Sequence, residues 1–537
     1  PRRHGPSRLN RLLCLIQSCD TLRRVTTILL RLESLLNWPV LFNQRLPHVR
    51  RRSTATLLFA VTAAVLLLPG CLATKSYEDA PTPDTDSLYG PRSVELDSTT
   101  LADVPWEAVF NDPTLRGLIR EALRNNLDLR ETIQQVRIAE ANLGEAKGAL
   151  FPDLFVGGTA SYNEPSYNGP SGTGQGAVQA TDQYSVSASS AWELDIWGRL
   201  TSVKRAQYAT LLQTEATRRA VQTALIANVA RAYYQLLALD RQLTITKETI
   251  QNRRSDLQTV RSLKEGGVVT NVAVERSRAS LEAARASLPT LRQAVTEQEN
   301  ALSVLLGRTP GPIDRTSLAQ QAPLDTLATG VPAQLLRNRH DVIAAEYQYR
   351  SAFELTNSAR AAFYPSLTVT AEGGFESLSA GDLLVPGSLF YILIGGLTQP
   401  LFANGRNEAR LKRRKARQQQ ARLNLRRSLL TAGSEVSNAL SRYQNTTERI
   451  AARQRQLDAL DAAVAESREL LRYGEENYLQ VLTAQQEYLA AQLDNVNDRL
   501  DRLQAGVALY RALGGGWDRS EPLRTGGESG DATASGQ

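Results

Sequence analysis

The chain has 537 residues, a formal net charge of +7 and an isoelectric point near 9.3. Residues 1–70 carry eleven arginines against Asp20 and Glu33, or +9, which leaves 7 − 9 = −2 for the rest. A near-neutral body argues against nucleic acid as a partner. Beyond residue 71 there is no cysteine, and the only histidine is His340. This scarcity argues against a disulfide framework, a histidine zinc site or a Ser/Cys–His catalytic pair.

Residues 46–70 have the pattern of a secretory signal peptide. Arg50, Arg51 and Arg52 precede an almost wholly apolar stretch from Leu57 to Leu68. That stretch is shorter than the ~20 apolar residues that a membrane-spanning helix needs, so it predicts export. Residues 1–45 lie ahead of this signal. Since the chain contains no methionine to mark a start, we interpret them as upstream, non-native sequence.

The residues Leu68-Pro69-Gly70-Cys71 resemble the bacterial lipoprotein signal, in which the cysteine becomes the acylated first residue of the mature chain. Pro69 departs from the small or aliphatic residue usual at its position. We expect Cys71 to be lipidated; the alternative is an ordinary signal peptide cut nearby, with Cys71 a free thiol. Residues 71–103, rich in Pro, Asp, Ser and Thr, are then a lipidated tether without a core.

Helical periodicity begins near Trp106, and a long helix is predicted for residues 127–150. Pro152 ends that pattern, because proline lacks the N–H that the helical ladder needs. Strands are predicted at about 153–163 and 183–195. The second strand alternates apolar and polar side chains, which predicts one face in an apolar medium and one in water. Its apolar side chains are Tyr184, Val186, Ala188, Trp192 and Leu194.

After Gly198 no glycine or proline occurs until Gly266. This predicts a helix of about 67 residues, or ~100 Å at 1.5 Å per residue, which a globular domain has no use for. A tip turn at 266–271, containing Gly267 and Thr270, is followed by another long helix to Leu306, interrupted only by Pro289.

The second half repeats the first. An offset of 213 relates Pro152 to Pro365, and an offset of 207 relates Gly198 to Gly405 and Gly267 to Gly474. We infer a tandem duplication. The second copy predicts strands at about 366–376 and 389–398, long helices at 407–473 and 478–513, and a tip turn at 474–477. The predicted boundaries are 104–310 for the first repeat, 311–329 for a linker, 330–515 for the second repeat and 516–537 for a disordered tail.

The predicted fold class is mainly α with a small β part, in which each repeat has long antiparallel helices and one β-hairpin. In lipid an open sheet edge is prohibitive, because its backbone groups have no water to bond. Four strands cannot close a barrel alone, whereas three chains would supply twelve. The polar faces, including Ser185, Ser187, Thr368 and Thr370, would then line a water-filled bore. The alternative is a soluble sandwich hairpin.

Several motifs between Trp106 and about Gly515 resemble the TolC-like outer-membrane efflux proteins, specifically the lipoprotein branch that serves resistance-nodulation-division pumps. They include Trp192 to Leu200, Arg339-His340-Asp341, Phe363 to Leu367, Gln399 to Phe402, and Tyr478 to Gln485. The resemblance implies a homotrimer with a twelve-stranded barrel in outer-membrane lipid, continued by a periplasmic α-helical barrel. It also implies a periplasmic adaptor and an inner-membrane pump as partners. The expected function is a passive exit duct for small molecules such as drugs or toxic compounds.

In this family the periplasmic gate lies at the turn between the last two long helices. The resemblance places a hydrophobic ring at Leu479. Thr483 and Gln486 stand where the family motif has an aspartate and an arginine, so a charged latch is in doubt. Glu475 and Glu476 could place carboxylates at the same mouth or be solvated turn residues. The candidate gate and tip residues are Gly267, Thr270, Gly474, Glu475, Glu476, Leu479, Thr483 and Gln486. The candidate helix–strand junctions are Pro152, Pro365, Gly198 and Gly405.

Two rival functions share some of these features. An exported trimeric coiled-coil adhesin or envelope scaffold also needs long helices, but the duplication and the internal hairpins argue against it. An enzyme would need a carboxylate pair in a pocket, whereas the acids here are spread along helices among lysines and arginines. The glycines from Gly172 to Gly176 lie in a hairpin loop, so a phosphate cradle is not expected. We therefore expect no enzyme, no cofactor and no metal, and the sequence does not specify the exported substrate.

Overall fold

The structure is a computed structural model that describes residues 74–77, 100–166, 180–323, 338–473, 475 and 477–517. The chain divides into units of residues 1–69 and 70–537, and every described residue belongs to the second unit. The signal peptide, Cys71, Gly172 to Gly176, Gly474, Glu476 and the tail after residue 517 lie outside the described residues. So do most of the tether and parts of the predicted linker.

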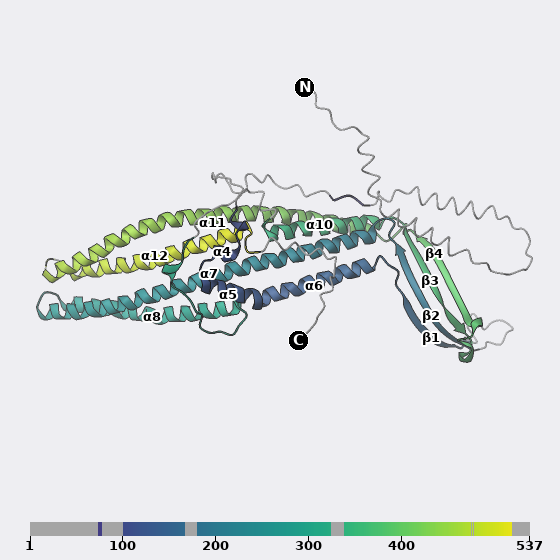
Figure 1. Cartoon of the computed structure of the whole chain (residues 1–537), viewed down its shortest axis with the longest axis horizontal. Coiled ribbons are helices and arrows are strands. Elements are labelled where there is room, and N and C mark those ends of the chain that lie inside the picture. Colours follow the sequence, from purple (N-terminus) through teal and green to yellow (C-terminus); the bar gives the residue numbers. More distant parts are fainter. Residues whose placement is uncertain are drawn as a thin grey trace, which may run out of the picture. The chain divides into compact units, whose positions relative to one another are not determined.

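Eight α-helices are described in these ranges (Figure 1). Of the predicted long helices, α7 and α12 have the predicted bounds, and α6, α8 and α11 differ by one or two residues at one end. The two longest, α7 and α11, have 67 and 68 residues. The helices are α4 (Trp106–Val109), α5 (Pro113–Asn125), α6 (Leu127–Gly148), α7 (Arg199–Glu265), α8 (Asn271–Leu305), α10 (His340–Ala361), α11 (Arg406–Tyr473) and α12 (Tyr478–Leu513). None of the described helices is both long and apolar enough to cross a membrane.

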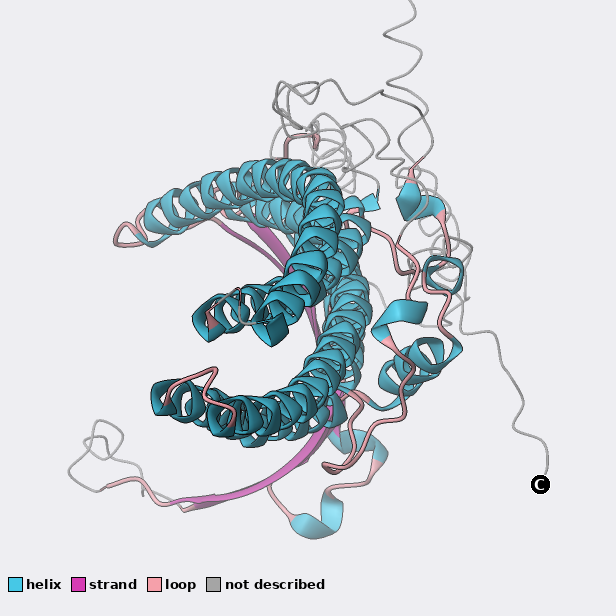
Figure 2. Ribbon diagram, turned by 90° about the vertical axis from the view of Figure 1, so that its left-hand side faces the viewer, coloured by secondary structure: helices cyan, strands magenta, loops and turns pink. Residues whose placement is uncertain are grey.

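The long helices lie side by side in two groups. On the strand side, α7 packs against α6 and α10, and α10 packs against α11. On the tip side, α7 pairs with α8 and α11 pairs with α12. Viewed along their axes, the helices follow an arc (Figure 2). An arc of helices is one segment of a larger wall and encloses nothing by itself.

The expected interruption at Pro289 is wrong, because α8 continues through it. Pro289 is exposed, so the carbonyl that loses its helical partner faces water. Ala284 and Ala286 nearby are strong helix formers, which favours continuation over a break.

The two hairpins join into one open antiparallel sheet with the strand order β1-β2-β3-β4. The strands are β1 (Phe155–Asn163), β2 (Thr181–Leu194), β3 (Ser366–Ser377) and β4 (Leu389–Thr398). β4 has its predicted bounds, and the other strands differ by one or two residues at their ends. β1 starts at Phe155 rather than 153, since Asp153 makes only a single backbone bond, to the Ala191 carbonyl at 3.1 Å. Within the chain β1 and β4 each have a partner on one side only.

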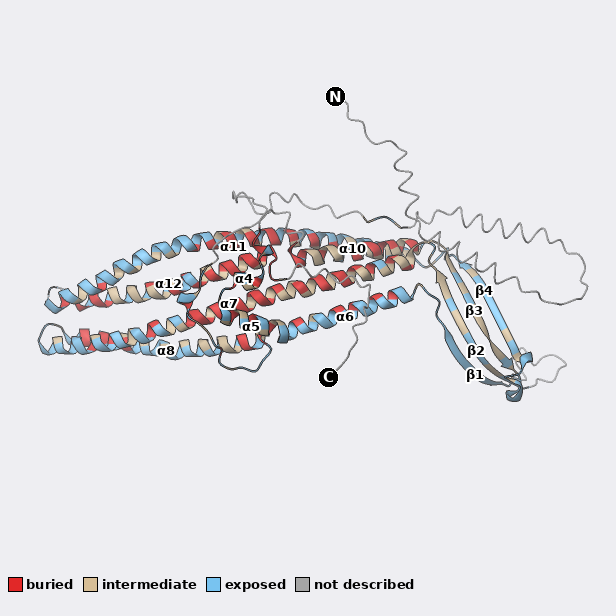
Figure 3. Ribbon diagram, in the orientation of Figure 1, coloured by how far each residue is buried: buried red, intermediate tan, exposed pale blue. Residues whose placement is uncertain are grey.

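The main core lies at mid-length, where α5, α7 and α12 meet (Figure 3). Tyr233 of α7 and Tyr510 of α12 are among its largest fully buried side chains. Asp112 begins α5 by accepting the Thr114 N–H at 2.8 Å, and its other oxygen accepts the Tyr233 hydroxyl at 2.7 Å. Towards the tips, and on α6 and the start of α11, more residues are exposed.

Candidate functional site

The tip between α7 and α8 turns on Gly267, which has a φ of +77°. This left-handed conformation favours glycine. The Gly267 and Val268 N–H groups donate to the carbonyls of Lys264 and Leu263, which satisfies the end of α7. Thr270 caps α8 with its backbone carbonyl and not with its side chain. These residues therefore shape the turn.

The tip between α11 and α12 presents the candidate gate residues. Leu479 is 46% exposed, while its neighbours Tyr478 and Val481 are buried. Asn477 caps α12 by accepting the Leu479 N–H at 3.0 Å, and the Glu475 N–H donates to the Leu470 carbonyl. The capped first turn holds Leu479 outward, where it is available to a neighbouring chain.

Within the part of the chain that the structure describes, neither Thr483 nor Gln486 has a charged partner at this tip. The Thr483 hydroxyl donates to the Leu479 carbonyl one turn earlier at 2.9 Å, which is a local helical bond. Gln486 is exposed. The uncharged motif positions therefore form no latch with the described residues of their own chain.

Charged contact occurs instead one to three turns above the tip, in what we call the tip cluster: Asp256, Arg468 and Gln485. Asp256 of α7 accepts hydrogen bonds from Arg468 of α11 at 3.2 Å and from Gln485 of α12 at 2.8 Å. The cluster ties one helical hairpin to the other. The sequence alone does not reveal the cluster, because its contacts depend on how α7, α11 and α12 lie side by side.

Arg253 lies beside this cluster and is 93% buried (7% exposed). Its Nη1 atom has no hydrogen-bond partner within the described residues. Burial lowers its pKa, although the charge of Asp256 opposes that shift. Arg253 follows the spacing of the buried positions Leu257 and Val260, so a charged residue in an apolar helical stripe was the available signal.

Apolar packing also joins the two hairpins near the tips. Leu257 and Val274 from α7 and α8 share one buried cluster with Tyr478, Val481 and Leu482 of α12. Burial raises the pKa of Tyr478, and a hydrogen bond with Ser277 of α8 opposes this rise. The hairpins are thus held together by apolar contacts and by the polar tip cluster.

The predicted junction residues lie where helices meet the sheet. Pro152 and Pro365 directly precede the strand region, and the Trp197 indole N–H donates to the Pro365 carbonyl at 2.7 Å. Trp197 also stacks on Tyr364, with ring centroids 4.9 Å apart. One side chain of the first repeat therefore joins the two junctions.

The starts of α7 and α11 share a left-handed glycine, since Gly198 and Gly405 both have a φ of +71°. Of these two helices, α7 is capped by a carboxylate: Asp195 accepts the Leu200 N–H at 2.9 Å and the Thr201 N–H at 2.6 Å. The preceding Glu193 forms a two-bond ion pair with Arg199 at 2.8 and 2.5 Å. Hydrogen bonding to Glu193 raises the pKa of Arg199.

The sheet has one apolar and one mainly polar face. Paired residues such as Val186 and Phe375, or Trp192 and Val369, share the apolar face. Ser185 and Ser187 share the opposite face with Thr368, Thr370 and Glu372. A sheet with this pattern suits lipid on one side and water on the other.

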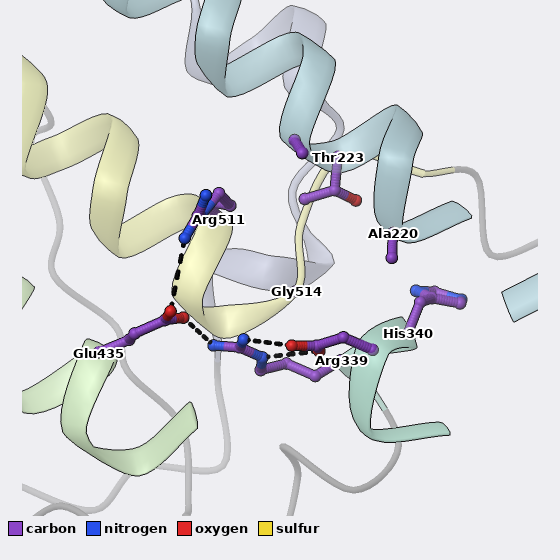
Figure 4. Close-up of a pocket in the computed structure, with 9 residues that line it drawn as sticks. Ala220, Thr223, Arg339, His340, Glu435, Arg511 and Gly514 are labelled. Carbon is purple, nitrogen blue, oxygen red and sulfur yellow. Dashed lines mark hydrogen bonds and ion pairs between the residues drawn. The ribbon is translucent and has the colours of Figure 1, made fainter. Parts of the chain in front are cut away.

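A charged cluster at mid-length lines a pocket (Figure 4), but its charged side chains pair with one another. Arg339, with 8% of its side chain exposed, pairs with Asp341 and Glu435, both at 2.6 Å. Arg511 approaches Glu435 at 3.5 Å beside a cavity of about 230 Å³. His340 is buried and packs edge-on against Trp517. The carboxylates are engaged by arginines, so the cluster joins α10, α11 and α12.

Long helices in an arc, continued by an open two-faced sheet, define a protomer of a multi-chain membrane channel. Known proteins give the same result. The family described as "Outer membrane efflux protein" matches residues 118–308 and 331–515. The chain belongs to this family. It is an outer-membrane efflux channel that forms trimers and works with a periplasmic adaptor and an inner-membrane pump.

Individual relatives cover most of the chain. It is 34% identical over 426 residues to the toluene efflux pump outer membrane protein TtgF of Pseudomonas putida, covering 79% of this chain and 88% of TtgF. The probable outer membrane lipoprotein SilC of Salmonella typhimurium is 29% identical over 85% of this chain and 98% of SilC. The solved outer-membrane channel OprN has a TM-score of 0.75 at 27% identity, covering 83% of this chain and 99% of OprN.

Proposed function

We propose that the chain is a passive exit duct whose periplasmic mouth is closed by Leu479 and by the contacts between the two helical hairpins. The observation that carries this proposal is the exposed Leu479 on a capped turn directly beside the buried contact of α7 and α8 with α12. The relatives' names differ in cargo, toluene for TtgF and cations for CusC of Escherichia coli. We infer that the pump selects the cargo and the duct conducts it.

The energy of closure is divided between two kinds of contact. Full burial of a leucine contributes ~1.5–3 kcal/mol, and Leu479 is already about half-buried within its own chain. Three leucines meeting at the trimer axis therefore add roughly 2–4 kcal/mol in total. The tip cluster adds a part-buried ion pair within each chain, between Asp256 and Arg468. Opening has to separate both.

The test is single-channel conductance of the purified protein in planar bilayers. Leu479→Ala should raise conductance because the ring loses most of its apolar area. Asp256→Asn should raise it as well, by weakening the link from α7 to α11 and α12. Thr483→Ala is the matched control on the same turn, since its only described contact is with the Leu479 carbonyl.

The tip acids give the contrasting arm. Glu475→Gln combined with Glu476→Gln should reduce cation preference without opening the pore, because carboxylates at a mouth concentrate cations. A channel that opens in the double glutamine variant while Leu479→Ala stays at the wild-type conductance would show that the latch is electrostatic.

Two further parts of the proposal concern the chain outside the duct wall. We infer that Cys71 is the acylated mature amino terminus, which the name of SilC as a lipoprotein supports by likeness. Mass spectrometry that finds an unmodified peptide running from Leu68 to Leu72 would contradict it. We also propose that the protein is no enzyme, because its family consists of channel proteins.

A further inference from the structure

The sheet carries acids but no bases. No lysine, arginine or histidine occurs between Lys147 and Arg199, or between Arg360 and Arg406, and these two stretches contain all four strands. Glu193 is neutralised by Arg199. Glu372 and Glu376 accept bonds only from neutral donors in the described residues, Ser187 at 2.9 Å and Gln183 at 2.6 Å respectively. Two uncompensated carboxylates per chain therefore lie on the polar face.

β4 departs from the polarity of that face. The strand register places Phe390 opposite Gly374, Ile392 opposite Glu372 and Ile394 opposite Thr370. These three apolar side chains therefore share the polar face, and we call them the β4 apolar row: Phe390, Ile392 and Ile394. The isoleucines are 46% and 57% exposed. About half of each isoleucine side chain is uncovered by the described residues, and a water-filled bore gives this area nothing apolar to pack against.

Membrane insertion does not account for the row. The lipid face of β4 is supplied by its alternate residues, Tyr391, Leu393 and Leu397, which are 87%, 74% and 70% exposed. Edge pairing does not account for it either: a neighbouring protomer's edge strand would bond to β4 through backbone groups and set its own side chains beside the row, but the row would still face the bore. The row is thus an apolar surface on the side of the sheet that faces the bore.

Charge and apolar area meet at one rung of the sheet. Side chains directly opposite each other in an antiparallel pair have Cβ atoms about 4.5–5.5 Å apart. Ile392 is the direct partner of Glu372. Glu376 lies beyond the last paired rung of β3 and β4, so it has no direct partner on β4 and neither isoleucine beside it. The two carboxylates therefore have different surroundings on the same face.

We propose that Glu372 and the β4 apolar row form a contact site for amphiphilic organic cations passing through the bore, one site per chain. The inference rests on the proposed function, because only a closed trimer turns this face into a bore. The carboxylate attracts the cation, the isoleucines cover its apolar part, and the Phe390 ring offers a cation–π contact. An exposed wall holds such a solute weakly, which allows it to leave again.

The test measures dye binding to the purified trimer in lipid nanodiscs by fluorescence anisotropy, with empty nanodiscs as the blank. Ethidium is the aromatic cation and anilinonaphthalene sulfonate the aromatic anion. The variants are Glu372→Gln, Glu372→Asp, Glu376→Gln as the matched control, and Ile392→Ser combined with Ile394→Ser. Each variant is first verified as a trimer by its sedimentation.

Wild type should bind ethidium more tightly than the anionic dye. Glu372→Gln should weaken ethidium binding roughly three-fold, the scale of one exposed charge contact, and Glu372→Asp should restore most of it. The double serine variant should weaken ethidium binding as well, whereas Glu376→Gln should leave it unchanged. Equal losses in Glu372→Gln and Glu376→Gln would overturn the site, since bore charge alone would then be responsible. An unchanged double serine variant would overturn it too.

Conductance separates this inference from the function on which it rests. If wild type binds ethidium as described but neither it nor Leu479→Ala conducts ions in planar bilayers, the exit duct is wrong and the cation site stands. If Leu479→Ala conducts while the Glu372 and isoleucine variants bind ethidium as wild type does, the duct stands and the cation site is wrong.

Discussion

In each repeat, the residue that precedes α6 or α10 donates a hydrogen bond to a backbone carbonyl at the end of α8 or α12, but the donor side chain differs. In the first repeat the Asn126 amide donates to the Leu305 carbonyl at 3.0 Å. In the second, Arg339 donates to the Ala512 carbonyl at 3.2 Å. The offsets of 213 and 207 residues make these pairs equivalent. Duplication has kept the contact and changed its donor.

The change of donor recruits charge in one repeat only. Arg339 also pairs with Asp341 and Glu435. In the first repeat, Asn126 instead uses its side-chain oxygen to cap α6, accepting the Leu129 N–H at 2.9 Å. In the first repeat Asn126 both caps a helix and donates to the Leu305 carbonyl. In the second repeat the equivalent Arg339 is the centre of an ion-pair cluster. Repeats of one fold can therefore differ in how they respond to truncation and acid.

The largest expected loss of stability comes from two equivalent glycines and should be the same in both repeats. Gly307 and Gly514 have φ values of +70° and +88°, and a Cβ on either would overlap the backbone carbonyl of Asn125 or Asn338 respectively. Gly307→Ala and Gly514→Ala should each destabilise the trimer by at least about 2 kcal/mol, from left-handed strain and this overlap. Thermal unfolding followed by circular dichroism measures it.

Gly311→Ala is the control for both glycine variants, because its Cβ would meet nothing within 4 Å and its φ is ordinary. A large loss in one repeat with tolerance in the other would break the equivalence of the two helix ends.

Truncating the donors should separate the repeats. Arg339→Ala should cost about 2 kcal/mol, since it removes the cation shared by the partly exposed carboxylates of Asp341 and Glu435 and leaves Glu435 with Arg511 at 3.5 Å. Asn126→Ala should cost about 1 kcal/mol, the usual scale of a lost helix cap. The same unfolding measurement compares them, and a greater loss for Asn126→Ala would reverse our ranking.

The smallest expected effect is the difference between the two repeats in how their carboxylates respond to acid. Burial alone would raise the pKa of Asp112, but hydrogen bonds from Thr316, Tyr233 and Gln321 outweigh it and lower the pKa. For Asp341, burial is likewise outweighed, here by Arg339. A carboxyl with a lowered folded-state pKa stabilises the protein fully above its unfolded pKa of about 3.9. That stability is lost as the pH falls below this value towards the folded pKa.

Unfolding temperatures measured from pH 6 to pH 3 should therefore fall, and both Asp112→Asn and Asp341→Asn should flatten that fall. Added salt should reduce the contribution of Asp341, which depends on a charged partner, more than that of Asp112, which depends on neutral donors. Equal salt responses at both positions would remove the distinction between the repeats.

Local periodicity was sufficient to predict most of the fold. The absence of glycine and proline between Gly198 and Gly266 predicted α7 residue for residue, and the repeat predicted β4. Spacing also placed both tip turns. The pairing of β2 with β3 was not predictable in the same way, since it joins segments far apart in sequence whose register no local pattern encodes.

The candidate site was predictable only in part. Leu479 was singled out through its family motif and is 46% exposed beside the tip turn, and its role in the gate stays a prediction. Asp256 and Arg468 were missed because their contact depends on how α7 and α11 lie side by side. The β4 apolar row was likewise hidden, because its meaning depends on which face Ile392 shares with Glu372.

The pairing of β2 with β3 also orders the events of folding. Gln183 and Glu376, joined by a hydrogen bond across this pair, are 193 residues apart in the chain. Closing so long a loop costs more entropy than forming either hairpin and slows the search for the correct register. During export the first hairpin emerges long before β3, the partner of β2, has followed it. The sheet therefore completes late, and its outer edges stay unprotected until other protomers arrive.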